Sequence, residues 1–171
     1  MNVSKKTKTD PSILASLNSG KEELVLQTIK ILHDSGNPLY IPYLTNLLGD
    51  TGFETVRESI YSLFGELKNK ESVPYLVEAI RNKELAPFRK QLVASCWQNG
   101  LDYSAHLLFF TDLVISEPWE IGFEAFTVIE NLEHLPEREI IEAAVSKIKM
   151  ALPASQDKKE YLLNGLLTLL R

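Results

Sequence analysis

The sequence predicts an all-α fold, a right-handed α–α superhelix (solenoid) built from about four to five helical hairpins. Three observations carry this prediction. Nearly the same four letters, IPYL at 41–44 and VPYL at 73–76, occur 32 positions apart. Apolar residues recur at helical spacing along most of the chain, and no segment shows the sustained two-residue alternation of a half-buried strand. Because one hairpin has too little interior to fold alone, we expect neighbouring hairpins to stack and complete one core.

The clearest hairpin spans residues 37–70. Pro38 is suited to a first helical turn, and the apolar residues that follow it fall on one helical face. The letters GDTG at 49–52 are a turn signal, and a second apolar helical face runs from Phe53 to Leu67. This segment is therefore expected to form two antiparallel helices.

A shift of 32 residues aligns this hairpin with the one that follows. The aligned pairs are Pro42/Pro74, Tyr43/Tyr75, Leu44/Leu76, Asp50/Asn82, Val56/Phe88, Arg57/Arg89 and Ile60/Leu92. Polar positions recur together with apolar ones, which coincidence in a Leu-rich chain rarely produces. Looser units follow, so we expect hairpins at 11–36, 37–70, 71–103, 104–135 and 136–171, after a flexible tail at 1–10.

Residues 41–67 resemble a HEAT repeat of the HEAT-like/armadillo type. The resemblance is carried by Pro42 in the first helix, Asp50 at the turn, Val56 and Arg57 in the second helix, and Gly65 near its end. It is specific over residues 37–100, and the later units keep only the hydrophobic rhythm. The resemblance implies a structural ladder in which side chains bond across to the turn of the neighbouring repeat, and the ladder positions here are Asp50, Arg57, Asn82 and Arg89.

Residues that carry catalysis or bind metals are sparse. Cys96, the only cysteine, lies in an apolar helical segment, so we expect a buried structural thiol and no disulfide. Glu130 and His134 have a spacing that two ligands on one helix share, but we interpret them as a solvated helix end with a histidine near the C-terminal carbonyl groups. The sequence contains no phosphate-binding loop or nucleophile motif. We therefore expect no enzymatic activity, no cofactor and no metal.

The charge of the chain is acidic away from its first residues. Apart from Lys5, Lys6 and Lys8 there are 15 basic residues against 23 acidic ones, a net charge of −8. This balance disfavours nucleic acid as a partner. No apolar run resembles a secretory signal or a membrane span, so we expect a cytoplasmic protein without membrane contact.

Aromatic residues on the second helices suggest where a partner binds, because second helices line the concave side of such arrays. We expect an aromatic strip made of Tyr61, Trp97, Trp119, Phe123 and Phe126, with a rim of Glu120, Glu124 and Glu130. Such a strip suits a basic or amphipathic protein or peptide. The alternative is that these rings fill the space between consecutive helices.

The C-terminal segment 160–171 is apolar nearly all round. Either this helix lies between its neighbours, or its outer leucines form a homodimer. For the whole chain we expect a non-catalytic interaction module: a scaffold, adaptor or regulatory subunit. Two other functions remain open, a nucleic-acid-binding HEAT-like protein and a HEAT-like lyase or chaperone for a cofactor.

Overall fold

The computed structural model describes residues 8–171, and this part of the chain is helical without a strand, which confirms the all-α prediction. Residues 1–7, most of the predicted tail, lie outside the described residues. The α-helices are α1 (Pro11–Leu17), α2 (Glu22–Ser35), α3 (Ile41–Asp50), α4 (Glu54–Gly65), α5 (Val73–Arg81), α6 (Arg89–Asn99), α7 (Leu107–Ser116), α8 (Trp119–Glu130), α9 (Arg138–Ala151) and α10 (Asp157–Leu169).

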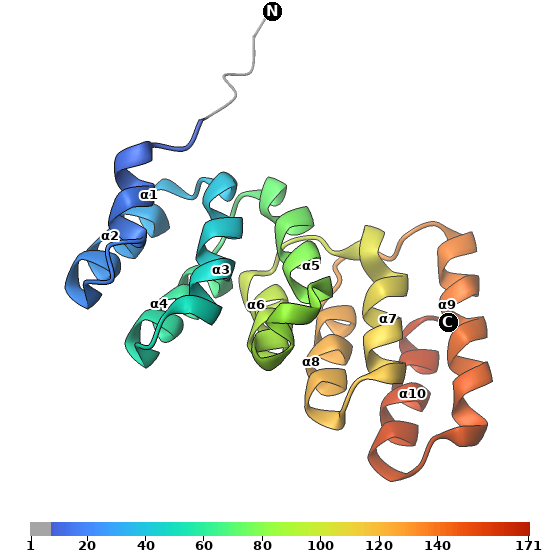
Figure 1. The fold of residues 1–171 in the computed structure, drawn as a ribbon. Helices are drawn as coiled ribbons and strands as arrows, with labels where there is room; N and C mark the ends of the chain where they lie inside the picture. The colour runs from blue at the N-terminus through green and yellow to red at the C-terminus, as the bar shows by residue number, and fades with distance from the viewer. Residues whose placement is uncertain (1–7) are drawn as a thin grey trace, which may run out of the picture.

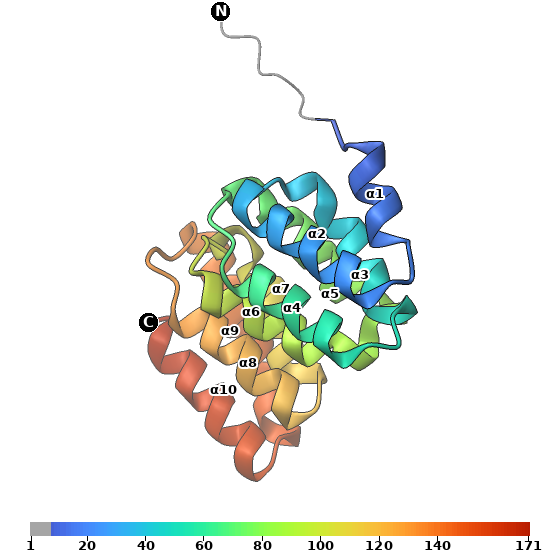
Figure 2. The same ribbon diagram turned by 90° about the vertical axis from the view of Figure 1, so that its left-hand side faces the viewer.

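The helices lie in two layers. Each odd-numbered helix packs on the even-numbered helix that follows it, and α2, α4, α6, α8 and α10 pack one on the next as a continuous row. In the other layer α3 packs on α5, and α7 packs on α9. Figures 1 and 2 show the hairpins side by side, from α1 and α2 at one end to α9 and α10 at the other. Each of the five predicted ranges contains one such pair.

Several helices begin later than the sequence predicts because a 3₁₀ turn precedes them. The segment Pro38–Tyr40 is a 3₁₀ turn, and α3 begins only at Ile41. The side chain of Asn37 accepts a hydrogen bond from the Leu39 amide at 3.0 Å, and Asn69 caps the turn before α5 in the same way. These asparagine caps fix a tight first turn, and the α-helical bonds begin after it.

Apolar side chains from both layers form one core. Leu44, Val56, Ile60, Leu76 and Leu92 are each at most 1% exposed. The C-terminal leucines join this core: Leu162, Leu163, Leu166 and Leu170 are buried, Leu167 is partly buried and Leu169 is 37% exposed. The leucines of α10 are therefore explained by the packing of this helix against α8 and α9.

Candidate functional site

The predicted aromatic strip lies on the layer of even-numbered helices, where the structure divides it into exposed and packed rings. Tyr61 on α4, together with Trp119 and Phe126 on α8, packs against the core. Trp97 on α6 and Phe123 on α8 are 37% and 45% exposed. Three of the five rings therefore fill space between helices, and the two exposed rings are the candidates for contact with a partner.

The exposed rings belong to a cluster that spans three helices. The indole Nε1 of Trp97 donates to Oε2 of Glu124 at 2.8 Å, which joins α6 to α8. Phe123 lies beside Trp119 with ring centroids 5.5 Å apart, and the Lys158 ammonium of α10 lies 5.4 Å from the Trp119 ring centroid. These contacts hold the rings in place on the surface.

Phe126 serves the packing of α8 against α10. A Cβ atom on Gly165 would lie 2.9 Å from Cε2 of the Phe126 ring, so the ring lies directly on the backbone of α10. Tyr61 is half-buried on α4, and burial raises the pKa of its hydroxyl. These two members of the predicted strip belong to helix packing more than to an open surface.

The even-numbered helices carry an excess of negative charge. They contain ten acidic residues and six basic ones, and three of the basic side chains bond to backbone carbonyls. Glu120 and Glu130 are exposed near the aromatic cluster, whereas Glu124 is half-buried and holds Trp97. The layer around the exposed rings is therefore acidic, as the rim residues predict.

One exposed ring on this layer is absent from the predicted strip. Tyr161 on α10 is 73% exposed and lies one helical turn after Lys158, the residue that contacts Trp119. The sequence signal was present, because Tyr161 interrupts an otherwise leucine-rich segment. The segment as a whole is so apolar that no single face stands out.

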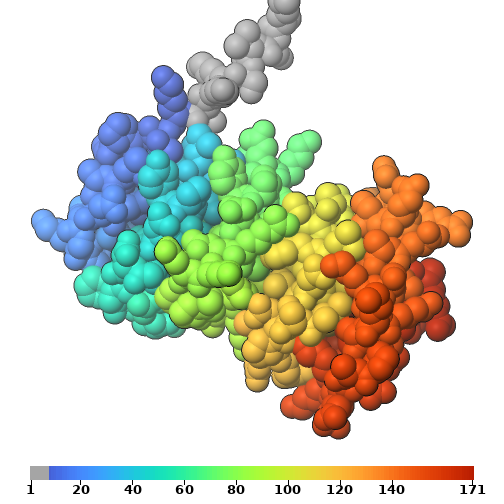
Figure 3. Space-filling model, turned by 45° about the vertical axis from the view of Figure 1, so that its right-hand side comes forward, coloured from blue at the N-terminus to red at the C-terminus, as the bar shows by residue number. Residues whose placement is uncertain are grey.

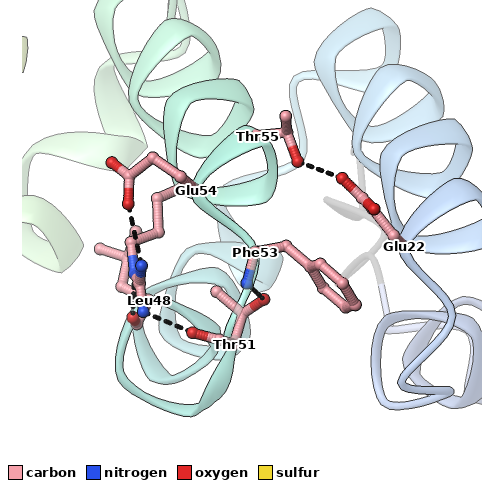
Figure 4. A network of polar contacts seen from close by, with 7 residues as sticks. Glu22, Leu48, Thr51, Phe53, Glu54 and Thr55 are labelled. Carbon is pink, nitrogen blue, oxygen red and sulfur yellow. Dashed lines mark hydrogen bonds and ion pairs between the residues drawn. The ribbon is translucent and has the colours of Figure 1, made fainter.

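Two of the four ladder residues occupy equivalent places in successive hairpins. Nε of Arg57 donates to the carbonyl oxygen of Leu48 at 3.1 Å, and Nε of Arg89 donates to that of Ile80 at 3.0 Å. Figure 4 shows the first of these sites, with Glu54 and Thr51 as further partners. Each arginine thus bonds to carbonyl groups at the end of the preceding helix, which otherwise have no partner within that helix.

The other contacts of the ladder residues differ between the two hairpins. Nη1 of Arg89 also contacts Oε1 of Glu117 at 2.7 Å, so this arginine reaches the next hairpin. Asn82 accepts a hydrogen bond from the Glu84 amide within its own turn. Asp50 is exposed and has no side-chain hydrogen bond to residues 8–171.

At the fourth hairpin, residues 104–135, a lysine from a distant helix takes the place of the arginine. Lys159 on α10 donates to the carbonyl oxygen of Val114 at 2.8 Å and also to that of Glu117. Gly122 on α8 lies beside this lysine, and a Cβ atom there would be in ordinary van der Waals contact with the Lys159 ammonium at 3.6 Å. The C-terminal end of α7 is thus stabilised by a cation, as the ends of α3 and α5 are. The 32-residue shift does not predict that Lys159 supplies this cation.

The remaining reactive groups do not converge. Among residues 8–171 there is no group of three or more His, Cys, Asp or Glu side chains placed to hold a metal. His33 contacts Glu66 at 2.9 Å between α2 and α4, and burial lowers the pKa of His106. Glu130 and His134 lie exposed at and beyond the end of α8.

Cys96 is 1% exposed in α6, and burial raises the pKa of its thiol to about 12. Because the thiolate is the reactive form, we expect Ellman's reagent to label the native protein only as fast as the protein opens. Labelling in urea is expected to be complete within the dead time of mixing. Rapid labelling of the native protein would show that α6 is open in solution.

No helix within residues 8–171 combines the length and the apolar character that a membrane crossing requires. Comparisons with protein-family models, with curated proteins and with solved structures gave no match for this chain.

Proposed function

We propose that residues 11–171 are a right-handed solenoid of HEAT-like repeats that binds a protein or peptide, without catalysis, on its even-numbered helices. The observation that supports the repeat is the arginine pair. Arg57 and Arg89 lie 32 residues apart, and each bonds to a carbonyl group nine residues earlier. Recurrence of both the residue and its bond is expected of a duplicated unit.

The partner that this surface suits is a basic amphipathic segment. Trp97 and Phe123 supply exposed apolar area, and they are held by Glu124 and Trp119. Glu120 and Glu130 supply negative charge beside them. Rigid aromatic anchors contribute affinity, and complementary charge steers the encounter and selects the partner. The acid excess of the layer opposes a phosphate backbone as ligand, so nucleic-acid binding is the weaker proposal.

The test combines capture with two substitutions. A partner is captured from the native cell, purified, and titrated against the wild type and against the Trp97→Ala/Phe123→Ala double variant. We expect the double variant to bind at least about tenfold more weakly, because exposed aromatic anchors dominate such interfaces. Raising the salt concentration should weaken the wild-type complex as well.

Tyr43→Ala is the matched control. Tyr43 is 41% exposed, as the two anchors are, but it lies on α3 in the other layer. Its removal should leave both affinity and helicity unchanged. Equal affinity of the double variant and the wild type would place the binding surface elsewhere, and turnover of a small substrate by the purified protein would overturn the non-catalytic proposal.

A further inference from the structure

The row of hairpins ends in two helix faces that no other helix of residues 8–171 covers. The C-terminal end of the row lies on the right in Figure 3. A hollow of about 660 Å³ runs along α9 at this end. Its apolar lining includes Ile141, Val145 and Leu170. Arg138, Lys149 and Arg171 stand around it. Because Arg138 is paired with Glu142 on its own helix at 2.7 Å, Lys149 and Arg171 supply the positive charge of this end.

The N-terminal end presents an apolar face of α2. The bonds of Glu22 to Thr55 and of His33 to Glu66 define the side of α2 that faces α4. At 100° per residue, Leu24 and Ile31 lie on the opposite side, where they are 37% and 58% exposed.

Acidic residues accompany this apolar face. Glu23 and Asp34 flank Leu24 and Ile31 on the exposed surface of α2, with Lys30 as the one lysine of the helix. The exposed face of α2 therefore carries two carboxylates and one lysine beside its apolar residues, whereas the hollow along α9 has Lys149 and Arg171 beside its apolar lining. These two faces are complementary in charge.

The junctions inside the row use the same chemistry. At two of them an apolar contact is accompanied by an ion pair that joins different hairpins: Arg89 with Glu117, and Asp112 with Lys147. At a third junction His33 contacts Glu66. An end face with an apolar stripe and cations of its own is therefore equipped to receive a further helix pair with acidic residues.

We propose that the N-terminal end of a second copy of this chain docks on the α9 hollow of the first, so that copies associate head to tail. The two contacting surfaces differ, so the contact is heterologous and leaves one free face at each end of the pair. Association therefore continues beyond a dimer as concentration rises.

The experiment is sedimentation velocity of the chain over a wide concentration range at low ionic strength. The wild type should show an average mass that rises above 19.3 kDa with concentration and falls when salt is added. Val145→Glu places a charge in the hollow, and Ile31→Glu places one on the face of α2. Each variant alone should stay monomeric at concentrations where the wild type associates.

An equimolar mixture of the two variants tests whether the contact joins the N-terminal end of one copy to the C-terminal end of another. Val145→Glu keeps an intact N-terminal end and Ile31→Glu keeps an intact C-terminal end, so the mixture should form a one-to-one dimer that grows no further. Tyr43→Glu, an exposed residue away from both ends, should associate as the wild type does. Circular dichroism checks the fold, and Lys149→Glu replaces Val145→Glu if that variant unfolds.

Three results would overturn the proposal. The first is a wild type that stays monomeric throughout the concentration range. The second is a mixture of the two variants that forms no dimer. The third is dimerisation of Ile31→Glu alone, since this would show that two C-terminal ends contact each other.

Discussion

Replacing Asn99 with Ala is expected to lower the free energy of unfolding by about 3 kcal/mol, although the substitution removes only a small side chain. Asn99 ends α6 and is 3% exposed. Its Nδ2 donates to the carbonyl oxygen of Phe64 and to the hydroxyl of Tyr103, both at 3.1 Å, and its Oδ1 accepts from the Leu101 amide at 2.9 Å. The Ala variant leaves these groups without their partner where water has little access.

Two further variants show whether the loss comes from this network. Tyr103→Phe removes only the hydroxyl group that bonds to Asn99 and should cost about 1 kcal/mol. Gln98→Ala changes the exposed neighbour and should stay within about 0.5 kcal/mol of the wild type. Urea denaturation followed by circular dichroism measures the free energy of unfolding of all three variants. The slope of this free energy against urea concentration should be the same as for the wild type. If Asn99→Ala and Gln98→Ala unfold at the same urea concentration, the network contributes nothing to the pairing of α4 with α6.

The helices could be predicted because their signal is local. Apolar side chains at helical spacing locate each helix, and Gly36 and Gly100 end α2 and α6 with φ angles of 58° and 66°. The starts were less accurate. An asparagine cap such as Asn37 looks the same in sequence whether a 3₁₀ turn or an α-helical turn follows it.

Polar contacts between hairpins could be predicted only where the repeat is regular. The 32-residue shift places Arg89 on Arg57, and their bonds to carbonyl groups recur with it. It places Asn99 on the apolar Leu67, so it gives no indication of the Asn99 network. Lys159 reaches Val114 from 45 positions away, a distance in sequence that no repeat length of this chain predicts.

The sequence predicts that the aromatic rings lie on the layer of even-numbered helices, but it does not predict which of the rings are exposed. Helical spacing places Trp119, Phe123 and Phe126 on one flank of α8. Whether a ring on that flank is covered depends on how closely the next helix approaches. Gly165 lets α10 lie against Phe126, whereas Phe123 stays 45% exposed. This depends on the rotation of two helices about their axes, which residues on one helix do not specify.

Replacing Arg89 with Met is expected to lower the free energy of unfolding by roughly 3 kcal/mol. Arg89 is 15% exposed and its partner Glu117 is 21% exposed, at a separation of 2.7 Å. The substitution removes the ion-pair partner of the mostly buried Glu117 carboxylate, which then has only the charge of Lys159 near it. It also removes the bond from Nε to the carbonyl oxygen of Ile80. An unpaired buried charge costs far more than the loss of an exposed ion pair.

Arg57→Met is the matched control, because Arg57 makes the equivalent bond to the carbonyl oxygen of Leu48 but pairs with Glu54, which is 68% exposed. It should cost about 1.5 kcal/mol. The Arg89→Met/Glu117→Gln double variant should recover part of the stability that Arg89→Met loses, since the introduced amide carries no charge to leave unpaired. Equal losses at Arg57 and Arg89, with no recovery in the double variant, would mean that both arginines act only through the helix end. The Arg89–Glu117 pair, which links the hairpin at 71–103 to the hairpin at 104–135, would then add nothing to stability.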